Sequence, residues 1–88
     1  MRIKINNEQW RVVEIERDET LMRGDTGYCN IKGKRIEIRE HLRPRMRLNT
    51  LVHEAIHAYM PHLNHKRVYE LGDLIEQLLW KDGYRRIK

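Results

Sequence analysis

The sequence predicts an α+β domain in which a small antiparallel sheet of about four strands, made of two hairpins, packs on two antiparallel helices. β-Branched and aromatic residues gather in the first half of the chain, with turn-forming residues between them. The second half carries two long stretches with apolar residues at helical spacing. The length of 88 residues, with no linker or repeat, indicates one domain over residues 1–88.

The first half of the chain is expected to form the two hairpins. Residues 2–5 and 10–16 alternate between apolar and polar side chains, and residues 6–8 between them favour a turn. Residues 28–31 and 35–39 flank Gly33, which can adopt the positive φ that a tight hairpin needs. Residues 17–27 are rich in Asp and Gly and are predicted to be a loop, with a short helical turn over residues 19–23 as the open alternative.

Capping residues define the two predicted helices. Pro44 suits the first turn of a helix, which then runs to Tyr59 or Met60, ahead of Pro61. Asn64 is a suitable N-cap for a second helix that ends at about residue 81, with Gly83 as the left-handed residue just past its end. The connection between them is short, so the helices should be antiparallel neighbours.

The first helix contains the motif His53-Glu54-Ala55-Ile56-His57. At about 100° per residue, the two histidines differ by about 40° and lie one turn apart, so both imidazoles can bind one metal ion. Two histidines, a third ligand and a water molecule make an open catalytic zinc site, and a glutamate beside it can act as general base. The motif therefore predicts a zinc-dependent peptidase with one Zn²⁺ per chain, His53 and His57 as ligands and Glu54 as the base.

The third zinc ligand is expected on or just before the second helix. An antiparallel return brings the early turns of that helix level with the two histidines and favours residues 68–73. Within that range Glu70 flanks the apolar stripe of the helix and is preferred, whereas Glu76 lies too far along. The alternatives are His62, in the loop after Pro61, and then Asp73 and His65.

Other polar residues have weaker predicted roles. Tyr59, Tyr69 or Tyr84 could donate a hydrogen bond to the oxyanion that develops during amide hydrolysis, although tyrosines more often serve in packing. Cys29 has no second cysteine beside it, so it is expected to be a small buried apolar residue.

Composition limits the location and the partners of the protein. One cysteine excludes an intrachain disulfide and suits a reducing compartment, which favours the cytoplasm. No stretch is long and apolar enough to suggest a membrane partner. The net charge of +5 and pI near 9.7 allow nucleic-acid binding, but the basic residues are spread along the chain without a binding motif. A peptide or protein substrate is the expected partner, and no oligomeric state is predicted.

The strand Ile36-Glu37-Ile38, followed by the helix that contains the motif, resembles the core of small zincin-type metallopeptidases of phages and prokaryotes. The similarity extends through residues 68–73 and 79–84, and SprT-like and ImmA-like proteins are further relatives of this kind. In gluzincin-type members a glutamate on the following helix is the third ligand, which implies Glu70 here. The resemblance also implies a strand along the cleft that an extended substrate could join. The small size of the chain favours one alternative, a non-catalytic zinc-stabilised module that binds a protein or nucleic acid.

Overall fold

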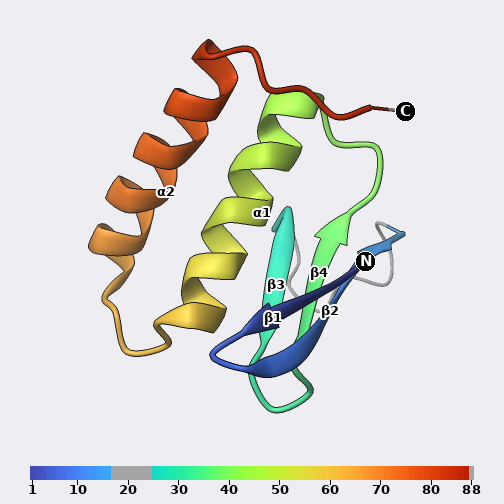
Figure 1. Cartoon of the computed structure of the whole chain (residues 1–88). Helices are drawn as coiled ribbons and strands as arrows, with labels where there is room; N and C mark the ends of the chain where they lie inside the picture. The colour runs from blue at the N-terminus through green and yellow to red at the C-terminus, as the bar shows by residue number, and fades with distance from the viewer. Residues whose placement is uncertain (17–24, 88) are drawn as a thin grey trace.

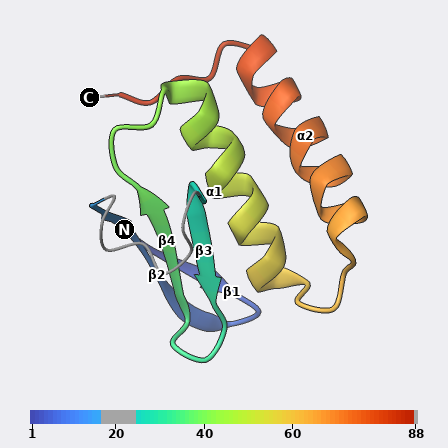
Figure 2. The same ribbon diagram turned by 180° about the vertical axis from the view of Figure 1, so that it is seen from behind.

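The computed structural model describes residues 1–16 and 25–87, in the order β1 (Arg2–Ile5), β2 (Glu8–Ile15), β3 (Gly27–Asn30), β4 (Arg35–Arg39), α1 (Pro44–Tyr59) and α2 (His65–Lys81). Figure 1 shows α1 between the sheet and α2, and the view from behind in Figure 2 shows the same three layers. The predicted α+β fold is confirmed. Most of the predicted loop over residues 17–27, namely residues 17–24, lies outside the described residues.

Both predicted hairpins are present. Asn6 and Asn7 adopt positive φ angles of 52° and 65°, as a two-residue turn between β1 and β2 requires. In the second hairpin the positive φ, 50°, falls at Lys34 instead of Gly33. The reason is a turn closed by the Lys34 N–H, which donates to the carbonyl oxygen of Ile31, while the Gly33 N–H donates to Asn30 Oδ1.

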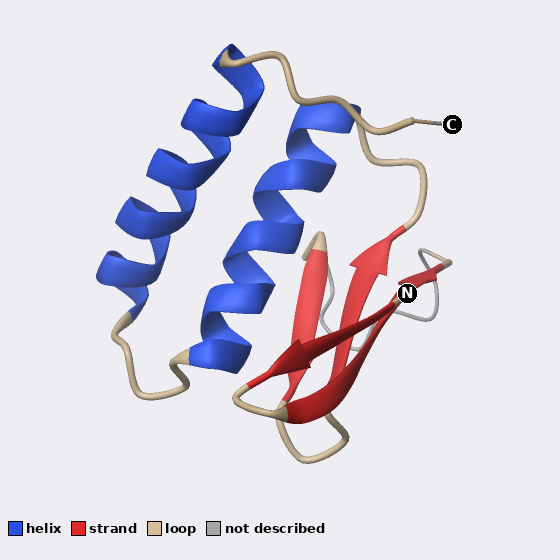
Figure 3. Ribbon diagram, viewed as in Figure 1, coloured by secondary structure: helices blue, strands red, loops and turns tan. Residues whose placement is uncertain are grey.

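The sheet is mixed, where the sequence predicted antiparallel pairing throughout. Its strand order is β1-β2-β4-β3, and each hairpin pairs antiparallel. The two hairpins join through β2 and β4, which run parallel, as Figure 3 shows by its strand arrows. This arrangement leaves β3 as the edge strand on the side that contacts α1.

The core lies between the sheet and α1. Ile36 and Ile38 of β4 are 1% and 0% exposed, and they pack with residues of β1, β2 and α1: Ile5, Trp10, Val12 and Ala58. The outer helix, α2, packs on α1 and buries Val68 completely. Neither helix in the described part of the chain is both long and apolar enough to cross a membrane.

Local sequence signals account for the helix ends. Pro44 occupies the first turn of α1, where its missing N–H is not needed. The side chain of Asn64 accepts a hydrogen bond from the Arg67 N–H and caps α2. Gly83, with φ of +94°, is the left-handed residue after α2. These three predictions are confirmed.

Pairs of side chains one turn apart show how α1 and α2 are aligned. The ring of His57 contacts that of His65, and the ring of His53 contacts that of Tyr69. Farther along, two polar pairs continue the series, Asn49 with Asp73 and Arg45 with Glu76. Each step of about four residues back along α1 is therefore matched by a step of about four residues forward along α2.

Candidate metal centre and catalytic cleft

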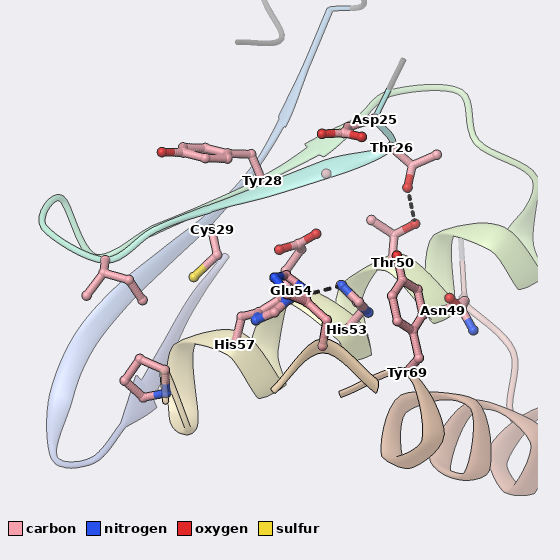
Figure 4. Close-up of a pocket in the computed structure, with 14 residues that line it drawn as sticks. Asp25, Thr26, Tyr28, Cys29, Asn49, Thr50, His53, Glu54, His57 and Tyr69 are labelled. Carbon is pink, nitrogen blue, oxygen red and sulfur yellow. Dashed lines mark hydrogen bonds between the residues drawn. The ribbon is translucent and has the colours of Figure 1, made fainter. Parts of the chain in front are cut away.

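A cleft of about 500 Å³ lies between β3, α1 and the start of α2. Its lining includes His53, Glu54 and His57 of the predicted motif, together with His65 and Tyr69 of α2. Figure 4 shows His53, Glu54, His57 and Tyr69 below the edge strand β3. All three motif residues predicted from the sequence therefore face one cavity.

The two motif histidines point their ring nitrogens at each other. His53 Nε2 and His57 Nε2 are 3.1 Å apart. Two nitrogens bound to the same tetrahedral zinc, at about 2.0 to 2.1 Å each, would be about 3.3 Å apart. The spacing of the pair therefore fits two ligands of one ion with almost no rearrangement.

The surroundings keep these imidazoles neutral, which is the form that binds metal. Burial lowers the pKa of His53, and the nearby His65 lowers it further, while the Asp73 carboxylate acts in the opposite direction. Burial also lowers the pKa of His57, followed by the effects of His53 and His65. Among the described residues, no third His, Cys, Asp or Glu is already assembled with the pair at coordinating distance.

His65 is the third histidine of the cleft. It is the first residue of α2, and its ring centroid lies 5.1 Å from that of His57. It is also among the charged groups that lower the pKa of both motif histidines, which places it in their immediate electrostatic surroundings. On chemistry and location, His65 fits the role of third ligand.

The preferred sequence candidate, Glu70, lies outside the cleft lining. Its carboxylate is exposed and pairs with Arg67 at 3.3 Å, one turn away on the same helix. The reason is helical geometry: Tyr69 faces His53, and the next residue points about 100° away around the helix.

The other candidates do not line the cleft either. His62 is exposed in the loop between the helices and does not line the cleft. Asp73 accepts a hydrogen bond from Asn49 Nδ2 at 3.1 Å. Glu76 is buried in an ion pair with Arg45, as its position farther along α2 suggested.

Glu54 is a buried carboxyl group in the cleft. It is only 9% exposed, and burial raises its pKa to about 7, with a further contribution from the Asp25 carboxylate. A general base works best when its pKa is near the operating pH, so the environment suits Glu54 to proton transfer at neutral pH. Asp25, just before β3, was not predicted as a site residue, and no sequence pattern marks it.

The edge strand approaches α1 closely beside Glu54. A Cβ atom on Gly27 would lie 2.6 Å from Thr50 Cγ2 and 3.2 Å from Glu54 Cγ, so only glycine fits there. The hydroxyl groups of Thr26 and Thr50 are 2.9 Å apart and join the strand to the helix (Figure 4). This contact covers Glu54 and closes one side of the cleft.

Cys29 lines the cleft from β3 and packs against the core. Burial raises the pKa of its thiol to about 11, and the Glu54 carboxylate adds to the effect. At neutral pH the group is therefore a thiol, which is a poor nucleophile and a poor metal ligand.

Of the three tyrosines considered, Tyr69 alone lines the cleft among the described residues. Its ring centroid is 4.7 Å from that of His53, and the side chain is 57% exposed at the rim. Tyr59 and Tyr84 are similarly exposed, but neither contributes to the lining.

Comparisons of the chain with protein-family models, curated proteins and solved structures find no match.

Proposed function

We propose that this protein is a zinc-dependent peptidase in which His53, His57 and His65 bind one Zn²⁺ and Glu54 is the general base. The observation that carries the proposal is the 3.1 Å separation of His53 Nε2 and His57 Nε2 in a cleft that also holds a buried glutamate. A structural histidine pair would not need an acid of raised pKa beside it, whereas amide hydrolysis does.

The chemistry divides between the ion and the chain. Bound zinc would polarise the substrate carbonyl and make a water molecule more acidic. The Glu54 carboxylate accepts the proton of the attacking water and then donates it to the amide nitrogen that leaves. Burial, which raises the pKa of Glu54 in the metal-free chain, favours the proton uptake that this role requires.

Three further points complete this proposal. Tyr69, at the rim beside His53, is the candidate hydrogen-bond donor to the developing oxyanion. A peptide or protein is the proposed substrate class, because the cleft is lined by the edge strand β3, which an extended chain can join. The cytoplasm is the proposed location, because a single cysteine, which can form no intrachain disulfide, suits a reducing compartment.

Metal analysis and cleavage of a fluorogenic peptide library test the proposal together. Wild type and Glu54→Gln should each retain about one zinc per chain after purification without added metal, and only wild type should cleave. His57→Ala should lose both metal and activity. Wild type without stoichiometric zinc would contradict the proposal, and zinc without cleavage would favour the non-catalytic module.

The third ligand is tested by a matched pair of variants. His65→Ala should weaken zinc binding at least about tenfold, whereas Glu70→Ala should bind zinc as wild type does, because its carboxylate is directed to Arg67. The reverse result would restore Glu70 as the ligand. Competition with a chromophoric zinc chelator measures both affinities.

A further inference from the structure

Three arginines form a row across the sheet. Arg2 of β1 is paired with Arg11 of β2, and Arg11 is in turn paired with Arg35 of β4. Residues paired in this way project their side chains on the same face, with neighbouring strands about 4.8 Å apart. Positions 2, 11 and 35 of the sequence thus become adjacent, at a total span of about 10 Å between the outer Cα atoms.

The row lies on the face that the helices do not cover. Trp10, Val12 and Ile36 alternate with the arginines along β2 and β4, and these apolar residues are buried in the core against α1. The arginines therefore point to the other side of the sheet. Figures 1 and 2 show both helices on one side of the sheet. By the same alternation, Lys4 and Arg39 belong to this side, here called the basic sheet face.

The charges of the basic sheet face are poorly balanced by the described residues. Among the described strand residues, Glu37 is the one carboxylate on the basic sheet face, and it pairs with Arg35 at 3.1 Å. Arg2, Lys4 and Arg11 are exposed and have no acidic partner in the described ranges. Like charges opposite each other on neighbouring strands destabilise a sheet.

Arginines on the helical side of the molecule behave differently. Arg45 pairs with Glu76, and Arg47 and Arg86 both pair with Glu14. Ion pairs thus occupy the three arginines named on that side. The arginines of the row instead lie side by side on neighbouring strands, a charge pattern that an anionic partner would complement.

We propose that the basic sheet face binds the phosphate backbone of single-stranded nucleic acid. A positive surface that follows a backbone, combined with an aromatic ring for base stacking, is the usual basis of such binding. Tyr28 supplies the ring: it is paired with Glu37 in the next row, and Figure 4 shows it on the side of β3 opposite Cys29 and Glu54. An open sheet offers no projecting helix or ribbon for insertion into a duplex groove. Tyr28 also lines the cleft, whereas the three arginines lie outside it, and the proposal does not depend on peptidase activity.

Fluorescence anisotropy with a labelled 20-nucleotide single-stranded DNA, over a range of KCl concentrations, tests the proposal. The variant Arg2→Gln/Arg11→Gln/Arg35→Gln should bind about 30- to 100-fold more weakly near 0.15 M salt, and its salt slope should fall by about 2. A control on α2 removes the same charge, Lys66→Gln/Arg67→Gln/Lys81→Gln, and should change affinity by less than about threefold. Tyr28→Leu should weaken binding about tenfold with an unchanged salt slope.

The folded state of each variant is checked by thermal melting followed by circular dichroism. The row variant removes like-charge repulsion but also the Arg35–Glu37 ion pair, so its melting temperature should stay close to that of wild type. The single variant Arg11→Gln is a smaller perturbation of the same row. Its affinity for the single-stranded DNA should fall about threefold to fivefold.

Three results would overturn the proposal. An equal loss in the row and control variants would show that only net charge matters. Tighter binding to the matching duplex than to the single strand would contradict the assignment to single strands. Row-dependent binding to phosphatidylserine vesicles without binding to the oligonucleotide would identify the partner as a membrane surface.

Discussion

Replacing Glu54 by glutamine is expected to stabilise the metal-free protein at neutral pH while abolishing peptide cleavage. The Glu54 carboxyl group is 9% exposed, and the causes that raise its pKa are burial and the Asp25 carboxylate. No hydrogen bond from the described residues offsets these effects. Glutamine keeps the shape of the side chain and removes the buried charge, so it removes an unfavourable contribution to folding.

The size of the effect follows from the pKa. The ordinary value of 4.5 applies to the unfolded chain and the value of about 7 to the folded chain. The folded chain therefore binds more protons between these values, and the free energy of unfolding falls as pH rises from about 4.5 to about 7. At about 1.36 kcal/mol per pKa unit, the loss reaches about 3 kcal/mol above pH 7. That is a large part of the stability of a small domain.

Urea denaturation in the presence of EDTA measures this effect. Glu54→Gln should exceed wild type by about 3 kcal/mol at pH 8 but by only about 1 kcal/mol at pH 5, where most of the carboxyl groups in the folded chain are protonated. Glu70→Gln, at an exposed glutamate, is the matched control and should stay within about 0.5 kcal/mol of wild type at both pH values. Equal stability of wild type and Glu54→Gln at pH 8 would refute the reasoning.

Three further predictions follow from the cleft and the helix pair. Gly72→Ala should stabilise the protein by about 1 kcal/mol in urea denaturation, because a Cβ there would be 3.7 Å from Ile56 Cδ1, an ordinary contact; destabilisation would show that the helices need glycine. Tyr69→Phe should lower kcat about 10- to 100-fold with zinc content unchanged, and equal effects of Tyr59→Phe would remove its role. In calorimetry, free zinc at about 1,000 times Kd should stabilise wild type over the EDTA-treated form by about 4 kcal/mol. His57→Ala should show no such difference.

The sequence identified features that depend on neighbouring residues. Pro44, Asn64 and Gly83 mark helix ends through local backbone geometry, so both helices were predicted within a residue or so. The motif histidines share a helix face for the same local reason. The parallel pairing of β2 with β4 depends on two hairpins meeting in space, and no local pattern encodes it.

His65 illustrates the limit of sequence reasoning about the site. From the sequence, residues 68–73 are expected to lie beside the motif. In the structure His57 and His53 lie beside His65 and Tyr69, about one turn earlier on α2. A signal was available: α1 ends at Tyr59 and α2 begins at His65, so the turn is centred near Pro61 and pairs His57 with the first residues of α2. The arginine row was harder to predict, because its members come from three strands whose pairing is not local.

The properties of Glu54 depend on the edge strand as much as on the motif. The motif places the carboxyl group beside His53 and His57, but an exposed glutamate on a helix would keep an ordinary pKa. Gly27 lets β3 come within a distance of α1 that no side chain would allow, and the Thr26–Thr50 contact maintains it. That approach buries Glu54 and raises its pKa to about 7. The edge strand of the sheet thus desolvates the carboxyl group that we propose as the general base.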